Sequence, residues 1–310
     1  MPCPEQETAS APLLHSAPVD GFRLAYTREG SGPAVILLHG WPGDSADYRQ
    51  VIPLLKDHAD VTVPDLRGFG ASDKHDEDPA TAYSASAQAR SVLGLIDELG
   101  LHDPVIAGYD VGSRVAQTVA RTAPARVRAI VVGPPLPGVG RRVLSAAAQR
   151  EFWYQAFHQL DLAAELIDGQ PQAVRAYLRH FWSHWSGPAF HQPEADLNRL
   201  VEAYGAPGAF TASIGWYRAG SGTVATSLNE EAPHPHERIS VATTILWPEH
   251  DPLFPQAWSD RLSDFFTSAS LRHLSGVGHF VPIEAPHAVA SAIKEVLKAG
   301  DARDQRTRRR

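Results

Sequence analysis

Residues 105–112 read Val-Ile-Ala-Gly-Tyr-Asp-Val-Gly, and this stretch decides the fold. Its first half is almost entirely apolar, as is typical of a buried parallel strand, and residues 113–122 then follow the pattern of a helix. The glycines at 108 and 112 permit a sharp strand-to-helix turn that leaves Asp110 exposed above the sheet. A glycine-flanked Asp is also common at helix N-caps, so the motif alone leaves both interpretations open.

Short apolar or β-branched runs recur on both sides of this turn. They predict strands at residues 22–27, 34–38, 60–64, 105–109, 127–132, 243–247 and 270–274, with a closing helix at 287–299. Alternation of such strands with helical patterns predicts an α/β fold, with a mostly parallel sheet covered by helices on both faces.

The alternation stops between the predicted strands at 127–132 and 243–247. Helical patterns take over at residues 141–167, 172–185, 194–204 and 210–219, and many of the aromatic residues lie there. An insertion at this point predicts a helical cap over the carboxyl ends of the strands, where open α/β sheets bind ligands. The domain prediction is a mobile leader (1–18), a core (19–134 and 235–300), the cap (135–234) and a disordered basic tail (301–310).

Composition excludes several classes of function. A net charge of −7 and a pI near 6.1 argue against a nucleic-acid partner. Cys3 is the single cysteine, which rules out an internal disulfide and a cysteine-based zinc site and fits a reducing compartment. The longest apolar run, residues 34–38, is too short to span a bilayer, and the first twenty residues lack the features of a signal peptide. We therefore expect a soluble cytoplasmic protein without a membrane partner, and a homodimer remains open.

An Asp at the exposed turn changes the reaction class. A carboxylate is a poor nucleophile for acyl carbon but a usable one at sp³ carbon, and the product is an ester whose carbonyl belongs to the enzyme. Water then attacks that carbonyl, so an oxyanion hole serves the second half-reaction. In hydrolases with this turn, the loop after an earlier strand supplies one donor. Residues 39–43 (His-Gly-Trp-Pro-Gly) occupy that place, and we assign the donors to the N–H groups of Trp41 and Val111.

The general base is predicted from chain order. His279 follows the last predicted strand, and Asp251 follows the strand at 243–247, which gives the order nucleophile, acid, histidine. A buried Asp beside the imidazole holds its tautomer and stabilises the imidazolium. His273 is the main rival for the base, and Glu249 is the alternative acid.

At this point the chain resembles the epoxide hydrolase branch of the α/β-hydrolase superfamily, which is close to the haloacetate dehalogenases. The resemblance covers most of residues 20–300 and is carried by residues 39–42, 65–73, 108–112 and 276–282. In the cap, residues 152–155 (Phe-Trp-Tyr-Gln) and 215–219 (Gly-Trp-Tyr-Arg-Ala) resemble the segments that hold two epoxide-activating tyrosines. The resemblance implies that Tyr154 and Tyr217 bind the epoxide oxygen and supply a proton when the ring opens.

Dehalogenation is the main alternative. Haloacetate dehalogenases carry two arginines after the nucleophile, whereas this chain has Val111 in the first place and keeps only Arg114. Residues 133–135 (Gly-Pro-Pro) also lack the acid that those enzymes keep after the sixth strand. Trp153 and Trp185 remain candidates for holding a halide. A non-catalytic small-molecule binding protein is a third, remote alternative.

The predicted function is hydrolysis of an epoxide to a vicinal diol through an alkyl-enzyme ester on Asp110, with the epoxide and water as the only partners. This chemistry needs no metal and no organic cofactor. The aromatic cap favours a bulky, planar or apolar epoxide. Residues expected to line its pocket are His39, Phe152, Trp153, Trp182, Trp185 and Trp216.

Overall fold

A central sheet forms the core of the computed structural model, which describes residues 11–308 and the side chains of residues 11–300. The strand order is β1-β2-β4-β3-β5-β6-β7-β8; β2 pairs antiparallel with both β1 and β4, and all other neighbouring strands pair in parallel. The strands are β1 (Leu14–His15), β2 (Ala25–Gly30), β3 (Ala34–Leu38), β4 (Asp60–Pro64), β5 (Val105–Gly108), β6 (Ala129–Val132), β7 (Ala242–Pro248) and β8 (Ala269–Leu274). Every residue of β3, β5 and β6 is buried, as expected for central parallel strands.

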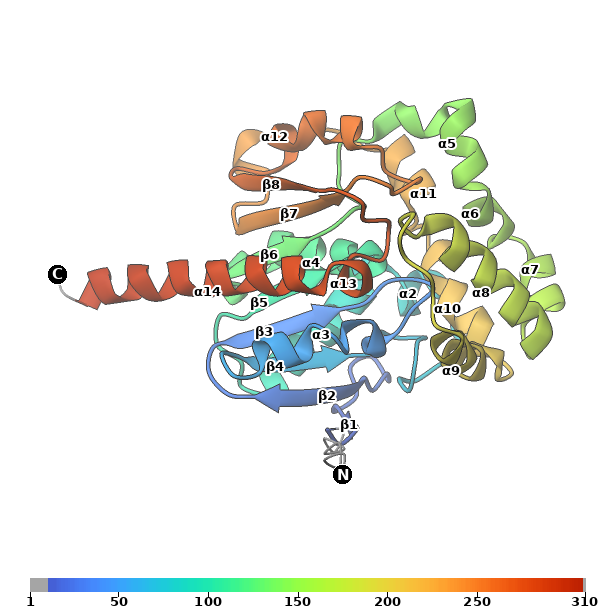
Figure 1. Cartoon of the computed structure of the whole chain (residues 1–310), viewed down its shortest axis with the longest axis horizontal. Coiled ribbons are helices and arrows are strands. Elements are labelled where there is room, and N and C mark those ends of the chain that lie inside the picture. The colour runs from blue at the N-terminus through green and yellow to red at the C-terminus, as the bar shows by residue number, and fades with distance from the viewer. Residues whose placement is uncertain (1–10, 309–310) are drawn as a thin grey trace, which may run out of the picture.

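Helices cover both faces of this sheet. Helix α3 packs beside α4 on one face, while α14 and α1 lie together on the other (Figure 1). The core helices are α1 (Ile52–Leu55), α2 (Pro79–Ala82), α3 (Ala85–Glu98), α4 (Asp110–Thr122), α12 (Leu262–Phe265), α13 (Val281–Glu284) and α14 (Pro286–Arg308). Short 3₁₀ turns occupy Ser45–Tyr48, Pro124–Arg126, Gly140–Leu144, Pro235–Glu237 and Gln256–Arg261. The predicted α/β-hydrolase fold is confirmed.

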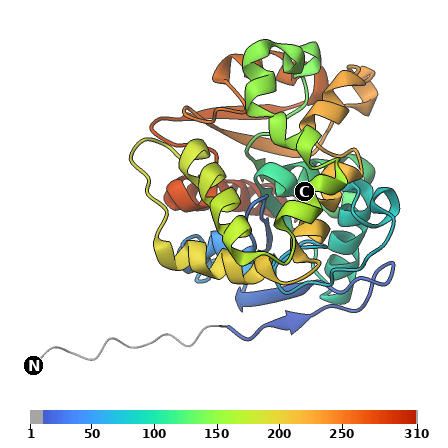
Figure 2. The same ribbon diagram turned by 90° about the vertical axis from the view of Figure 1, so that its right-hand side faces the viewer.

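The cap is the helical insertion between β6 and β7. It contains α5 (Ala146–Glu151), α6 (Trp153–Phe157), α7 (Asp161–Ile167), α8 (Pro171–Trp185), α9 (Glu194–Gly205), α10 (Ala209–Arg218) and α11 (Thr223–Leu228). The arrows of β3 and β4 point toward these helices in Figure 1, and Figure 2 looks onto them. On α8, buried residues recur every three or four positions, so one apolar face packs inward.

Three local predictions differ from the structure. Residues 22–24 are not in β2, because Asp20 and Gly21 have positive φ and close a tight turn there. Residues 14 and 15, expected in a mobile leader, pair with β2 because its outer edge offers free hydrogen-bonding groups. The closing helix continues to residue 308 where a disordered tail was expected; residues 1–10 and 309–310 lie outside the described part of the chain.

The cap and the core also contain helices that the sequence patterns did not separate. The stretch 141–167, expected to be helical throughout, is divided into a 3₁₀ turn, α5, α6 and α7. Helices α3 and α11 were not predicted. None of the helices within residues 11–308 is long and apolar enough to cross a membrane.

Candidate functional site

The turn between β5 and α4 holds Asp110 in a strained conformation. Its φ of 48° lies in the left-handed region, and its N–H donates to the carbonyl of Pro134 over 3.0 Å. A Cβ on Gly108 would come within 2.5 Å of the Gly112 main chain, and one on Gly112 within 2.0 Å of the Leu38 carbonyl oxygen. The two glycines are therefore required for the close approach of strand and helix.

The two carboxylate oxygens of Asp110 have different partners. Oδ1 accepts a hydrogen bond from the N–H of Trp41 over 2.8 Å, and Oδ2 lies 3.4 Å from Nε2 of His279. The N–H of Val111 lies in the first turn of α4, where no intrahelical acceptor exists. One predicted oxyanion donor thus touches Asp110, and the role of Val111 stays a prediction.

A buried Asp supports the imidazole from its far side. Oδ2 of Asp251 lies 2.9 Å from Nδ1 of His279, and both side chains are almost fully buried. Oδ1 of Asp251 accepts from the N–H of Leu253 over 2.9 Å, which orients the carboxylate. The fold therefore brings together Asp110, His279 and Asp251 from three separate loops at the carboxyl ends of the strands.

These carboxylates determine the charge of the imidazole. Burial disfavours the charged ring, but Asp251 and Asp110 outweigh it and raise the pKa of His279 to about 10. The resting site holds an imidazolium between two carboxylates. The ring must lose this proton before it can accept one from water, and neutralising either carboxylate favours that loss.

The rival residues lie elsewhere. Glu249 is exposed and accepts from the hydroxyl of Ser275 and from the N–H of Gly276, and the side chain of His273 is also exposed. His184, which has metal-like spacing to His180, is bonded to Glu151 instead. Among the residues described, no cluster of three or more His, Cys, Asp or Glu side chains forms a candidate metal site.

Two phenols from the cap lie over this triad. Tyr154 and Tyr217 are buried, and their rings meet edge to face with centroids 5.5 Å apart. The indole of Trp41 stacks on Tyr154 at 5.7 Å. Burial raises the pKa of Tyr154 well above its usual value, and the charge of Asp110 adds to the rise. Burial and neighbouring Tyr154 do the same for the pKa of Tyr217. Both phenols therefore keep their protons at neutral pH.

Of the predicted pocket residues, Trp185 is the one whose ring meets both halves of the site. Its centroid lies 5.0 Å from that of His279 and 5.2 Å from that of Tyr154. Phe152 and Trp216 are buried, and Phe152 packs edge-on against Phe254. Contact of Phe152 and Trp216 with a substrate stays a prediction.

Three of the predicted pocket residues have other roles. Both ring nitrogens of His39 contact the main chain. Nδ1 lies 3.0 Å from the carbonyl oxygen of Gly40, and Nε2 accepts a hydrogen bond from the N–H of Leu66. Trp182 donates to the carbonyl of Pro42 and stacks on Phe280. Trp153 is 42% exposed on the outside of the cap. In the structure these three side chains tie loops together or face solvent, and their contact with a substrate stays a prediction.

Two buried groups near the site carried no signal in the sequence. Tyr109 donates its phenol proton to Oδ2 of Asp47 over 2.6 Å, directly behind the turn that holds Asp110. His158 is fully buried, with Nε2 2.9 Å from the phenol oxygen of Tyr177. Burial, aided by the charge of Arg218, lowers the pKa of His158 to about 3, so its ring is neutral.

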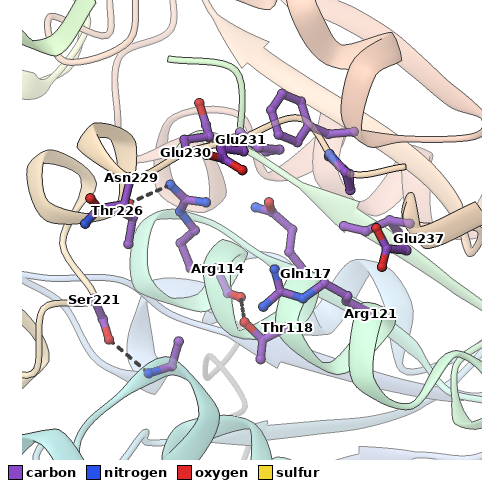
Figure 3. Close-up of a pocket in the computed structure, with 15 residues that line it drawn as sticks. Arg114, Gln117, Thr118, Arg121, Ser221, Thr226, Asn229, Glu230, Glu231 and Glu237 are labelled. Atoms are coloured by element: carbon purple, nitrogen blue, oxygen red, sulfur yellow. Dashed lines mark hydrogen bonds between the residues drawn. The ribbon is translucent and has the colours of Figure 1, made fainter. Parts of the chain in front are cut away.

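Arg114, the remaining arginine of the dehalogenase-like pattern, lines a cavity that does not include Asp110. Its Nη2 donates to the hydroxyl of Thr226 over 3.1 Å. The cavity that it lines has a volume of about 330 Å³ and includes Glu230 and Glu231, but not Asp110 (Figure 3). In this position the guanidinium does not hold a substrate carboxylate against Asp110.

Comparisons with known proteins agree with this geometry. The family described as alpha/beta hydrolase fold matches residues 33–286. The chain is 29% identical to "Soluble epoxide hydrolase" of Corynebacterium sp. (strain C12), over 89% of this chain and 93% of that protein. It is 26% identical to "Haloalkane dehalogenase 2" of Mycobacterium tuberculosis (strain ATCC 25618 / H37Rv), over 88% and 91%.

A solved structure gives the same result in three dimensions. The structure described as "Epoxide hydrolase CorEH without ligand" has a TM-score of 0.80 at 25% identity, and the alignment covers 93% of this chain and 99% of that one. The chain is therefore a hydrolase that belongs to the alpha/beta hydrolase fold family.

Proposed function

We propose that the protein is an epoxide hydrolase that forms an alkyl ester on Asp110 and releases a vicinal diol. The observation that carries this proposal is the pair of buried, protonated phenols, Tyr154 and Tyr217, packed over a carboxylate nucleophile. An alkoxide is a poor leaving group in a dry pocket, so ring opening needs such an acid. The relative from Corynebacterium, named an epoxide hydrolase, supports the same reaction.

The two carboxylate oxygens of Asp110 act in different steps of this mechanism. Oδ2 attacks one oxirane carbon while a phenol protonates the oxygen that leaves that carbon. Oδ1, already bonded to the N–H of Trp41, becomes the carbonyl oxygen of the ester. When water adds to that ester, negative charge develops on Oδ1, where the donor is already in place.

Ester formation also turns His279 into a base. Esterification removes the charge of Asp110, and with it part of what holds the pKa of His279 high. Asp251 remains to orient the ring and stabilise the imidazolium that forms when His279 takes a proton from water. The base thus becomes available only after the nucleophile has reacted.

Isotope labelling tests the ester directly. In a single turnover in H₂¹⁸O, with protein in excess over an aromatic epoxide, the heavy oxygen should appear in the peptide that contains Asp110. The diol of that first turnover should stay unlabelled, because its new oxygen comes from the carboxylate. Label in the diol with none in the peptide would show direct attack by water instead.

Dehalogenation is a second candidate, favoured by one observation. The indole Nε1 of Trp41 is buried and has no hydrogen-bond partner within the described residues, and such an N–H can hold a halide. One relative is named a haloalkane dehalogenase. A parallel panel of epoxides, haloalkanes and haloacids, with product analysis, separates the two reactions. No turnover of any of them, or a trace of turnover that Asp110→Asn leaves unchanged, would favour a binding protein.

A further inference from the structure

Gln155 joins the phenol of Tyr154 to the last helix of the cap. It follows Tyr154 on α6 and is buried. Its Oε1 accepts from the N–H of Val224 over 2.9 Å, and its Nε2 donates to the phenol oxygen of Tyr154 over 3.1 Å. A main-chain N–H can only donate, so the amide oxygen must face Val224 and the amide nitrogen must face the phenol.

The start of α11 holds this amide in place. A Cβ on Gly222 would lie 2.7 Å from Oε1 of Gln155 and 3.0 Å from a ring carbon of Tyr217, so glycine is needed for the close approach. The same segment is tied to the core by Arg114, which donates to Thr226, and by Ser221, which accepts from the N–H of Ala85 (Figure 3). The amide therefore cannot turn over without moving α11.

We infer that Gln155 is a positioning residue for ring opening: it holds the phenol of Tyr154 with its proton free to reach the substrate oxygen, and it stabilises the phenolate left behind. This inference rests on the proposed function. A phenol oxygen that accepts from an amide must direct its own O–H elsewhere. In the resting site this hydrogen bond satisfies the buried amide. It contributes to the reaction only if the phenol ionises during ring opening.

Bonds and protons balance in the ring-opening step. Oδ2 of Asp110 forms a bond to an oxirane carbon as the C–O bond breaks, and that electron pair goes to the substrate oxygen. The oxygen takes the proton of Tyr154, whose phenolate then accepts the hydrogen bond from Nε2 of Gln155. The imidazolium of His279 then gives its proton to the phenolate, and the neutral ring takes a proton from the water that hydrolyses the ester. The pKa of Tyr154 agrees with this role, since burial and Asp110 raise it while the bond from Gln155 lowers it.

Two substitutions separate this role from simple packing. Gln155→Met keeps the length of the side chain and removes the donor. Gln155→Glu keeps the acceptor for Val224 and presents either a carboxyl proton or a negative charge to the phenol, according to pH. Gln149→Met is the matched control, because Gln149 is a cap glutamine whose Nε2 donates to the carbonyl of Val143, away from the site. Thermal unfolding of all three variants checks that the cap is retained.

The measurements are single-turnover rates of ester formation and ester hydrolysis with one epoxide, from pH 5 to pH 9. Gln155→Met should slow ester formation by about 10–100-fold at every pH, as expected for one hydrogen bond to a developing charge, and should largely spare hydrolysis. For Gln155→Glu, the rate of ester formation relative to wild type should be highest at low pH and fall as the glutamate ionises. Gln149→Met should match wild type.

Each contrary result has one meaning. Equal rates of ester formation in Gln155→Met and wild type overturn the inference. So does equal slowing of both steps in Gln155→Met and Gln155→Glu with no dependence on pH, because that pattern belongs to a structural role. Wild-type protein that opens no epoxide and forms no ester refutes the proposed function itself.

Discussion

The N–H of Trp41 already donates to Oδ1 of Asp110 before any substrate is present, over 2.8 Å. In the proposed mechanism, this contact assigns the two oxygens of one carboxylate to different steps. Oδ1 is held by the N–H of Trp41, while Oδ2 lies 3.4 Å from Nε2 of His279 and is the oxygen proposed to attack the substrate. The same contact would orient the carboxylate for both half-reactions.

Replacing His279 by Gln should separate the two half-reactions. Without an imidazole to activate water, alkylation of Asp110 proceeds and hydrolysis of the ester stalls. Intact mass spectrometry should show an adduct of the substrate's mass, and peptide mapping should place it on Asp110. Retained turnover with no adduct would remove His279 as the base.

Replacing Asp251 by Asn should slow hydrolysis of the ester by roughly 10⁴-fold, the effect of removing the charge of a triad acid. Alkylation under single-turnover conditions should change much less, because the imidazole takes no proton in that step. Glu249→Gln is the matched control, since Glu249 is exposed and bonded to Ser275. If Glu249→Gln slows ester hydrolysis instead, the assignment of Asp251 as the triad acid is wrong.

Replacing either cap tyrosine by Phe should slow alkylation by an epoxide by about 10–10³-fold, because the remaining phenol partly substitutes. The double variant Tyr154→Phe/Tyr217→Phe should be nearly inactive in this step, and hydrolysis of an ester already formed should be largely spared. Chloroacetate and fluoroacetate should be poor substrates of the wild type, because Arg114 lines another cavity. Rapid halide release from them, with inertness toward epoxides, would favour the dehalogenase.

Replacing Asp110 by Asn imitates the uncharged ester and should lower the pKa of His279. In the wild type that pKa is raised to about 10, and the carboxylate of Asp110, 3.4 Å from Nε2, supplies part of the rise. Titration of the imidazole by NMR, with intact mass as a check that the Asn persists, measures the change. An unaltered pKa would mean that Asp251 alone holds the proton, and the base would not be released by ester formation.

Protonation of His158 should make the protein sensitive to acid. Its pKa is lowered from 6.5 to about 3, so between these values the unfolded chain binds a proton that the folded chain does not. The free energy of unfolding should therefore be unaffected by this group above pH 6.5 and decrease as pH falls below it. The expected slope from this one group is about 1.4 kcal/mol per pH unit.

Denaturant unfolding from pH 7 to pH 4 measures that slope. His158→Phe should make it shallower by the contribution of one proton, although loss of the bond to Tyr177 lowers stability at neutral pH. The exposed His191 serves as control, and His191→Gln should leave the slope as it is. An unchanged slope in His158→Phe would show that this ring is not the acid-sensitive group.

Local sequence determined the parts of this protein that depend on the backbone. Short apolar or β-branched runs favour strands, so residues 34–38 and 60–64 were predicted with the bounds that β3 and β4 have. The glycines around Asp110 allow a tight turn, and parallel strands bring their carboxyl ends to one edge. Asp110, Asp251 and His279 follow three of those ends, so their meeting was predictable from chain order.

Tertiary structure alone decided which cap side chains reach the site. An aromatic residue on an amphipathic helix is predicted to be buried, but the pattern does not say against what: Trp185 meets His279, whereas Trp153 faces solvent. One partner of Gln155, the N–H of Val224, comes from a segment 69 residues away, and no local pattern encodes that contact. Periodicity follows from the geometry of one element, while contacts between distant elements depend on how the whole chain packs.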